Sequence, residues 1–174
     1  MHNLVWSEKR TGAASVVINN DTLWVVGGVS DLSIFPNTTE FIKLDQPPVK
    51  GPDLPLLNHY GKESPLLNCL YHSMIQYDEK SIYIIGGRQN GDSAPGVWSS
   101  NTWIIDPTNR FKIREGPSLN EKRCTHGCAK MNMNGKTVLV VAGGFNFDSK
   151  LQSVEILDPS SNKGWVKGLL ICWP

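Results

Sequence analysis

The sequence predicts an all-β protein built from a repeated four-stranded unit. Three short hydrophobic runs each end in a pair of glycines, and the first glycines of these pairs are 59 and 57 residues apart. The flanks repeat too, with a β-like run before each pair and a run ending in aspartate after it. A nearly constant interval indicates stacked copies of one supersecondary unit. The pairs are Gly27 and Gly28, Gly86 and Gly87, and Gly143 and Gly144.

The first two strands of each unit are expected to form a hairpin. Turn-forming residues join them, as at Asn19, Asn20 and Asp21, which suits a tight connection between antiparallel strands. The glycines that end the second strand free the backbone for positive φ and close approach to a neighbour. The first strands are expected within residues 12–18, 71–77 and 125–133, and the second within 23–28, 82–87 and 138–144.

Two further strands complete each unit. Asp-Pro follows the third strand at 106–107 and at 158–159, and proline there presets a turn and ends the ladder. Four strands joined up and down form one twisted antiparallel sheet, which cannot bury both faces alone, so neighbouring sheets must stack. The third strands are expected within 40–45, 101–106 and 153–158, and the fourth around 50–52, 115–117 and 167–168.

This pattern resembles the kelch repeat, in which each repeat forms one blade of a β-propeller. The matching features are the double glycine, the hydrophobic run ending in aspartate, and a fourth-strand tryptophan, clear at Trp165 and with a counterpart at Trp6. Val49 and either Phe111 or Ile113 stand in the tryptophan's place in the other units. The resemblance implies a kelch region over 1–168, with blades at about 11–55, 69–119 and 123–168, strand 3–6 from a preceding blade, and an atypical tail at 169–174.

Three blades and one strand fall short of the four to eight blades that close a propeller. An open arrangement would leave strand edges unpaired, which invites association. We therefore expect a partial propeller. Its missing blades would come from a longer chain or from another copy that closes the ring.

Composition excludes several classes of function. Seventeen basic and sixteen acidic side chains nearly balance, which favours neither nucleic acid nor an anionic membrane as a partner. No apolar stretch approaches the roughly eighteen residues of a membrane span, and the N-terminus has no hydrophobic signal core. The four cysteines show no disulfide framework. These features predict a cytoplasmic protein.

No catalytic or metal-binding residue is expected. Cys124, His126 and Cys128 are metal-type ligands, but alternate residues of a strand lie about 6.6 Å apart, too far for three neighbours to close on one zinc ion. His72 and His126 precede their glycine pairs by fourteen and seventeen residues, which indicates a repeated strand position. Neither a Gly-x-Ser-x-Gly elbow nor a phosphate-binding loop is present, and we expect no cofactor.

An enzyme remains the alternative, because some kelch-type propellers are copper radical oxidases resembling galactose oxidase. That chemistry needs tyrosine and histidine ligands and a cysteine–tyrosine crosslink. The four tyrosines provide no convincing set, although Cys69 lies two residues from Tyr71.

A binding scaffold is the favoured function. Loops at one end of a propeller present a surface on a rigid frame, and arginine and aromatic residues are enriched in binding hot spots. Arg10 and Arg123 have an equally weighted alternative role, which is to tie neighbouring blades together. The resemblance implies protein partners, as in substrate recognition for ubiquitin ligases or actin binding, usually with a BTB domain upstream. The candidate binding residues are Arg10, His59, Tyr60, Arg88, Arg123, Phe145, Asn146 and Phe147.

Overall fold

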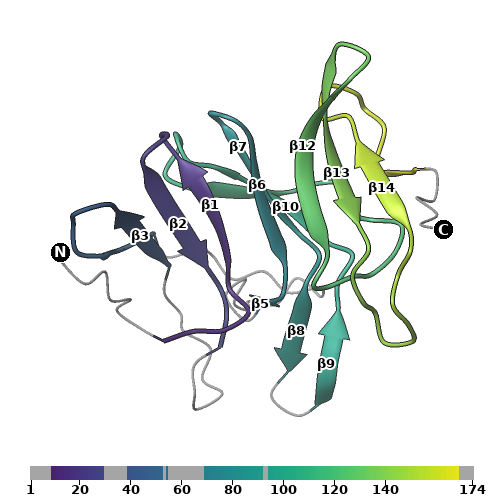
Figure 1. The fold of residues 1–174 in the computed structure, drawn as a ribbon, viewed down its shortest axis with the longest axis horizontal. Helices are drawn as coiled ribbons and strands as arrows, with labels where there is room; N and C mark the ends of the chain where they lie inside the picture. The colour runs from purple at the N-terminus through teal and green to yellow at the C-terminus, as the bar shows by residue number, and fades with distance from the viewer. Residues whose placement is uncertain (1–8, 30–38, 53, 55–68, 92–93, 169–174) are drawn as a thin grey trace.

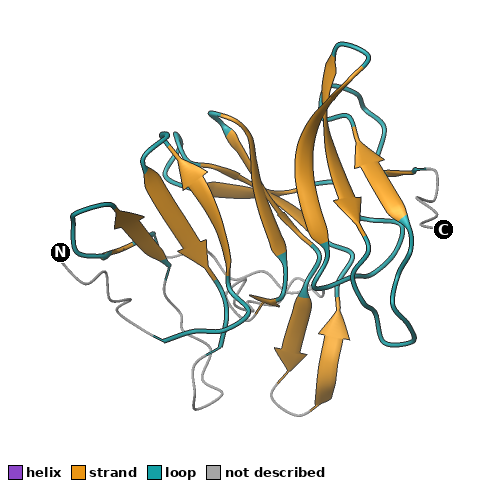
Figure 2. Ribbon diagram, in the orientation of Figure 1, coloured by secondary structure: helices purple, strands orange, loops and turns teal. Residues whose placement is uncertain are grey.

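The structure, a computed structural model, describes residues 9–29, 39–52, 54, 69–91 and 94–168. Within these ranges the chain forms strands and turns and no helix (Figure 2), so no described segment is an apolar helix of membrane-spanning length. Three four-stranded antiparallel sheets follow one another along the sequence and stand side by side (Figure 1). This confirms the all-β class and the three four-stranded units.

In each sheet the strands pair in the expected up-and-down order. The first sheet contains β1 (Ala14–Ile18), β2 (Thr22–Val26), β3 (Glu40–Lys43) and β4 (Val49–Lys50). The second contains β6 (Ser73–Asp78), β7 (Ser81–Ile85), β10 (Thr102–Asp106) and β11 (Lys112–Glu115). The third contains β12 (Gly127–Met133), β13 (Lys136–Ala142), β14 (Val154–Leu157) and β15 (Val166–Lys167).

A fourth, smaller sheet was not expected. It contains β5 (Cys69–Leu70), β8 (Arg88–Gly91) and β9 (Ala94–Trp98), in the order β5–β8–β9. Residues 88–91 and 94–98, which follow the second glycine pair, form the two arms of a hairpin in which Arg88 pairs with Trp98 and Gln89 with Val97. We call these three strands the inserted sheet.

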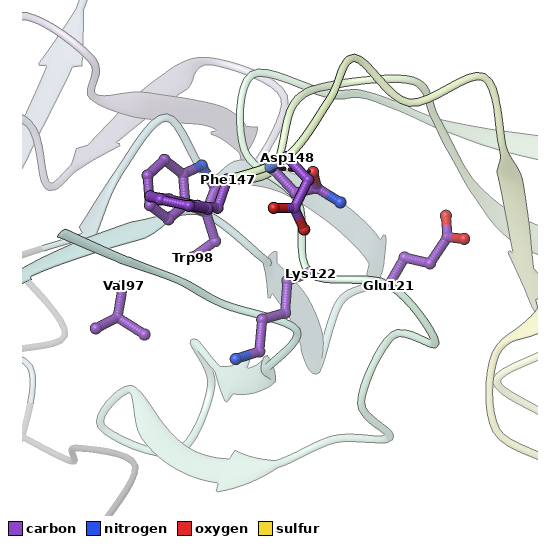
Figure 3. Close-up of a pocket in the computed structure, with 7 residues that line it drawn as sticks. Val97, Trp98, Glu121, Lys122, Phe147 and Asp148 are labelled. Carbon is purple, nitrogen blue, oxygen red and sulfur yellow. Dashed lines mark hydrogen bonds between the residues drawn. The ribbon is translucent and has the colours of Figure 1, made fainter. Parts of the chain in front are cut away.

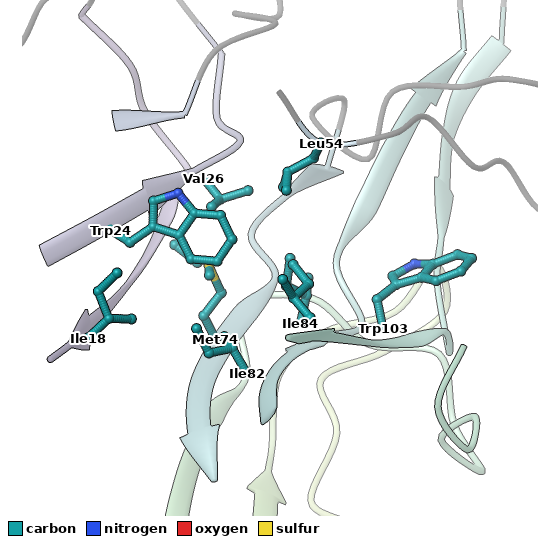
Figure 4. Packing of buried hydrophobic residues seen from close by; sticks show 10 residues of the cluster. Ile18, Trp24, Val26, Leu54, Met74, Ile82, Ile84 and Trp103 are labelled. Carbon is teal, nitrogen blue, oxygen red and sulfur yellow. The ribbon is translucent and has the colours of Figure 1, made fainter. Parts of the chain in front are cut away.

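The middle strand β7 carries apolar side chains on both faces. Ile82 and Ile84 join the core toward the first sheet, with Trp24 and Val26 (Figure 4), whereas Tyr83 and Ile85 join the core toward the third sheet. Successive side chains of a strand point to opposite faces. An unbroken apolar run is therefore what a sheet covered on both sides requires. The second core also contains Ile104, Leu119, Leu139, Val141, Leu157 and Trp165.

Main-chain hydrogen bonds link the residues that precede the first strands of the three sheets. Gly12, Tyr71 and Thr125 each lie just before the first strand of a sheet and have positive φ, at +70°, +55° and +52°. The Tyr71 N–H donates to the Gly12 carbonyl at 2.9 Å, and the Thr125 N–H donates to the Tyr71 carbonyl at 2.8 Å. The same left-handed turn thus connects each sheet to the next one.

The glycine pairs have the conformation that the sequence predicts. All six glycines have positive φ, between 61° and 98°. At Gly86 the requirement is also spatial, because an added Cβ would lie 2.6 Å from the Arg123 carbonyl oxygen of the neighbouring unit. Gly143 has room, since the nearest atom to its added Cβ would be the Leu151 carbonyl oxygen at 3.6 Å.

Replacing Gly86 by alanine should destabilise the chain more than replacing Gly143 by alanine. Both residues have similar φ, +61° and +65°, so both variants share a backbone strain of about 1–2 kcal/mol. At Gly86 the methyl group also overlaps a carbonyl at the joint between two sheets, and we expect a total loss of roughly 3 kcal/mol or more. Urea unfolding midpoints measure the difference, and equal losses would contradict the close approach.

Candidate functional site

An aromatic cluster lies where the inserted sheet meets the third sheet. The Trp98 ring, at the end of β9, has its centroid 6.0 Å from that of Phe145 and 5.5 Å from that of Phe147, with interplanar angles of 68° and 76°. The Arg88 guanidinium carbon lies 5.2 Å from the centroid of the Trp98 ring. Edge-to-face ring pairs and cation–π contacts are both favourable. We call Arg88, Trp98, Phe145 and Phe147 the aromatic cluster.

The turn that carries the two phenylalanines is held by hydrogen bonds. Cys124 and Phe145 exchange N–H and C=O bonds in both directions at 3.0 Å. The Asn146 Oδ1 accepts from the N–H groups of Asp148 and Ser149 at 3.0 and 2.9 Å. Phe147 is thereby fixed at the tip, where it is 71% exposed, and Phe145 is 40% exposed.

A cavity of about 470 Å³ adjoins the cluster (Figure 3). Glu121 in its wall accepts a hydrogen bond from the Ser153 hydroxyl, which lowers the pKa of that carboxyl, with Lys167 and Arg123 acting in the same direction. By contrast, the charged groups of Lys122 and Asp148 have no partner among the described residues and remain available to a ligand. The labelled wall residues are Val97, Trp98, Glu121, Lys122, Phe147 and Asp148.

The structure brings part of the predicted set together. Arg88, Phe145 and Phe147 meet in the cluster, and Asn146 shapes the turn between the two phenylalanines. His59 and Tyr60 lie outside the described residues. Trp98, which Arg88, Phe145 and Phe147 all contact, was not among the predicted binding residues. Its signal was a lone large aromatic residue at the end of an otherwise small and polar stretch.

Of the two roles expected for Arg123, the structure supports the one that ties neighbouring units together. Its side chain is fully buried and donates to the Gly143 carbonyl at 2.7 Å and to the Glu155 carboxylate at 2.9 Å, both in the third sheet. Its main chain bonds to the residues that follow β9 and β7: the Arg123 N–H donates to the Ser99 carbonyl, and the Gly87 N–H donates to the Arg123 carbonyl. The assignment of Arg123 as a partner-binding residue is therefore corrected, because it ties two sheets together.

Arg10 makes the same contacts in the first sheet. Its buried guanidinium donates to the Gly27 carbonyl at 3.1 Å and to the Glu40 carboxylate at 2.5 Å. Arg10 is thus also corrected from a binding residue to a structural one. In the second sheet, register places Trp103 where the other sheets have Glu40 and Glu155.

Trp165 has the structural role that the sequence predicts. It is buried in the core between the second and third sheets, and its Nε1 donates to the Pro117 carbonyl at 2.9 Å. Register places Pro48 and Ile113 at the equivalent positions. The expectation that Val49 fills the tryptophan's place is wrong, since Val49 aligns with the exposed Val166.

The two aligned histidines occupy the predicted repeated position. His72 immediately precedes Ser73, which pairs with Ile85, the residue before the second glycine pair. His126 immediately precedes Gly127, which pairs with Ala142, the residue before the third glycine pair. His126 is buried, with its Nε2 2.7 Å from the Ser73 hydroxyl, and burial lowers its pKa from 6.5 to about 4, with contributions from Arg123 and His72. Within the described ranges, no three His, Cys, Asp or Glu side chains gather as a metal site requires.

Comparison with known proteins identifies the fold. No protein-family model matches the sequence, and no curated protein matches it. A solved structure titled "Structure of YjhT" is similar with a TM-score of 0.67 and 12% sequence identity, over 96% of this chain and 53% of that chain. This chain therefore spans about half the length of the matched structure, and at this identity the likeness concerns the fold alone. Together with the three stacked sheets, it shows the fold of a β-propeller fragment.

Replacing Arg123 by methionine should cost far more stability than replacing Lys136 by methionine. The first change leaves the buried Glu155 without its cation, which costs roughly 3–5 kcal/mol. The second removes an exposed pair with Asp158, which is worth less than about 1 kcal/mol. Chemical denaturation of both variants measures this, and a loss at Arg123 as small as that at Lys136 would show that the buried pair does not hold the joint.

The stability of the chain should fall as the pH drops from 6.5 toward 4. The pKa of His126 is about 4 in the folded chain against 6.5 ordinarily, so in this range the unfolded chain binds the proton more readily. The stabilisation is fully present above pH 6.5, and the loss of stability amounts to about 3 kcal/mol by pH 4. Unfolding at several pH values would show it, and the variant His126→Gln should flatten the profile. An unchanged profile in that variant would refute the assignment.

Proposed function

We propose that this chain is a non-catalytic interaction module that binds a partner protein through the aromatic cluster. The observation that carries the proposal is the exposure of Phe147 and Phe145 on a turn fixed by hydrogen bonds, beside the Trp98 ring. Solvent-exposed aromatic side chains that are already ordered lose little freedom on binding, which favours affinity.

The surroundings of the cluster support a protein as the partner. The cavity combines apolar wall residues with the available charges of Lys122 and Asp148. Protein interfaces have this composition, an apolar centre with a polar and charged rim. The cluster also stands on loops at the ends of packed strands, where a scaffold can present contacts without disturbing its core.

The resemblance to kelch repeats supports two classes of partner. One is a substrate protein that is captured for a ubiquitin ligase, and the other is actin. Both would place the chain in the cytoplasm. Because the chain spans about half of the matched propeller structure, we further propose that the remaining blades come from a longer chain or a second copy and complete the binding face.

Replacing Phe147 by alanine should reduce partner capture at least tenfold. Loss of an exposed, ordered aromatic contact at the centre of an interface costs about 1.4 kcal/mol or more. Leu44→Ala is the matched control, because Leu44 is also a large exposed side chain, at 81%, and lies at the β3–β4 turn of the first sheet. Quantitative pull-down followed by mass spectrometry measures both variants.

The two variants give a clear decision. Capture that falls with Phe147→Ala and is unchanged with Leu44→Ala supports the aromatic cluster as the binding site. Capture that is lost equally in both variants, or in neither, would refute it. Circular dichroism of each variant confirms that the sheets remain folded.

A further inference from the structure

The inserted sheet ends in an unpaired strand. Its order is β5–β8–β9, so β8 is paired on both sides and β9 on one side only. An edge strand presents main-chain donors and acceptors that can pair with another chain. In Figure 1 the turn that follows β13 runs on the far side of β9 from β8.

The hydrogen-bond pattern shows which main-chain groups are available. The Ser99 N–H donates to the Gly87 carbonyl at 2.9 Å, and the register continues with Arg88 opposite Trp98 and Gln89 opposite Val97. Hydrogen-bonded and non-hydrogen-bonded pairs alternate in an antiparallel ladder. The Trp98 N–H and C=O therefore point away from β8, and no described residue pairs with them.

The cavity beside the aromatic cluster follows this open edge. Val97 and Trp98 both line it, although consecutive side chains of a strand project to opposite faces. A cavity that reaches both residues lies along the strand edge. Val97 is 53% exposed, so its side chain is open to solvent on one face of β9.

The rest of the cavity sets the chemistry of an occupant. Trp98 and Phe147 provide aromatic surface, Asp148 lies beside Phe147, and the Lys122 ammonium group extends toward the side of Val97 (Figure 3). A chain lying along β9 would pass an aromatic wall and meet one positive group and one negative group in the same cavity.

We propose that β9 accepts an extended segment of the partner protein as an added strand. This inference rests on the proposed function and specifies its binding mode. The segment exchanges hydrogen bonds with the Trp98 main chain and places an apolar or aromatic side chain against Trp98 and Phe147. It carries an acidic residue toward Lys122 and a basic residue toward Asp148. Strand addition draws affinity from the main chain and specificity from alternate side chains.

Selection from a displayed library of random twelve-residue peptides on the 174-residue chain tests the chemistry. We expect enriched peptides with an apolar residue between an acidic and a basic one. Lys122→Glu should weaken the best synthetic peptide at least tenfold and shift the selection away from acidic residues. Lys163→Glu, the same charge change at another exposed lysine, should leave both unchanged.

Amide exchange tests the strand geometry. Saturation with the selected peptide should slow exchange of the Trp98 amide at least tenfold, measured by NMR. N-methylation of the peptide should abolish binding at alternate residues only, because half of its amides would face β9.

The outcomes separate this inference from the proposed function. Failure to enrich a peptide, equal effects of the two lysine variants, or an unprotected Trp98 amide would each overturn strand addition. If Phe147→Ala still reduces capture of a folded partner in that case, the cluster binds a protein surface and the proposed function stands. If Phe147→Ala also has no effect, both proposals fall.

Discussion

The joint between the second and third sheets depends on Arg123, and the candidate site depends on that joint. The main chain of Arg123 accepts a hydrogen bond from the Gly87 N–H and donates one to the Ser99 carbonyl. Its guanidinium donates to the Gly143 carbonyl and to the Glu155 carboxylate. The next residue, Cys124, pairs with Phe145. One short segment therefore fixes both the packing of two sheets and the turn that presents the aromatic cluster. A buried charge in this place is tolerable because the Glu155 carboxylate neutralises it and carbonyl groups accept hydrogen bonds from a terminal nitrogen of the guanidinium.

The sequence predicted the three main sheets because their signals are local and repeated. Each glycine pair has positive φ, which other residues adopt only at a cost. The apolar run of β7 is unbroken, which is typical of a strand whose sheet is covered on both faces. The inserted sheet escaped prediction since Gln89, Asn90 and Gly91 have the composition of a turn. The sequences of β8 and β9 show no hydrophobic alternation that would mark them as strands.

The site was predicted in part for a related reason. Phe145 and Phe147 are conspicuous in a short turn, and the turn's position follows from the repeat. Trp98 belongs to the site because Phe145 and Phe147, on the turn that follows β13, contact its ring. The sequence of β9 alone does not reveal such a contact. The role of Arg123 was ambiguous because an arginine near a loop can either bind a partner at the surface or tie two sheets together. The deciding residue, Glu155, lies 32 positions away in the third sheet.

The bonds that link Gly12, Tyr71 and Thr125 use only main-chain atoms. Three different side chains occupy this one structural position, so the linkage places little restriction on residue identity. A sequence can then diverge widely while the stacking geometry persists, provided that a left-handed residue is kept at each junction. At each junction, then, backbone conformation rather than side-chain chemistry carries the contact between one sheet and the next.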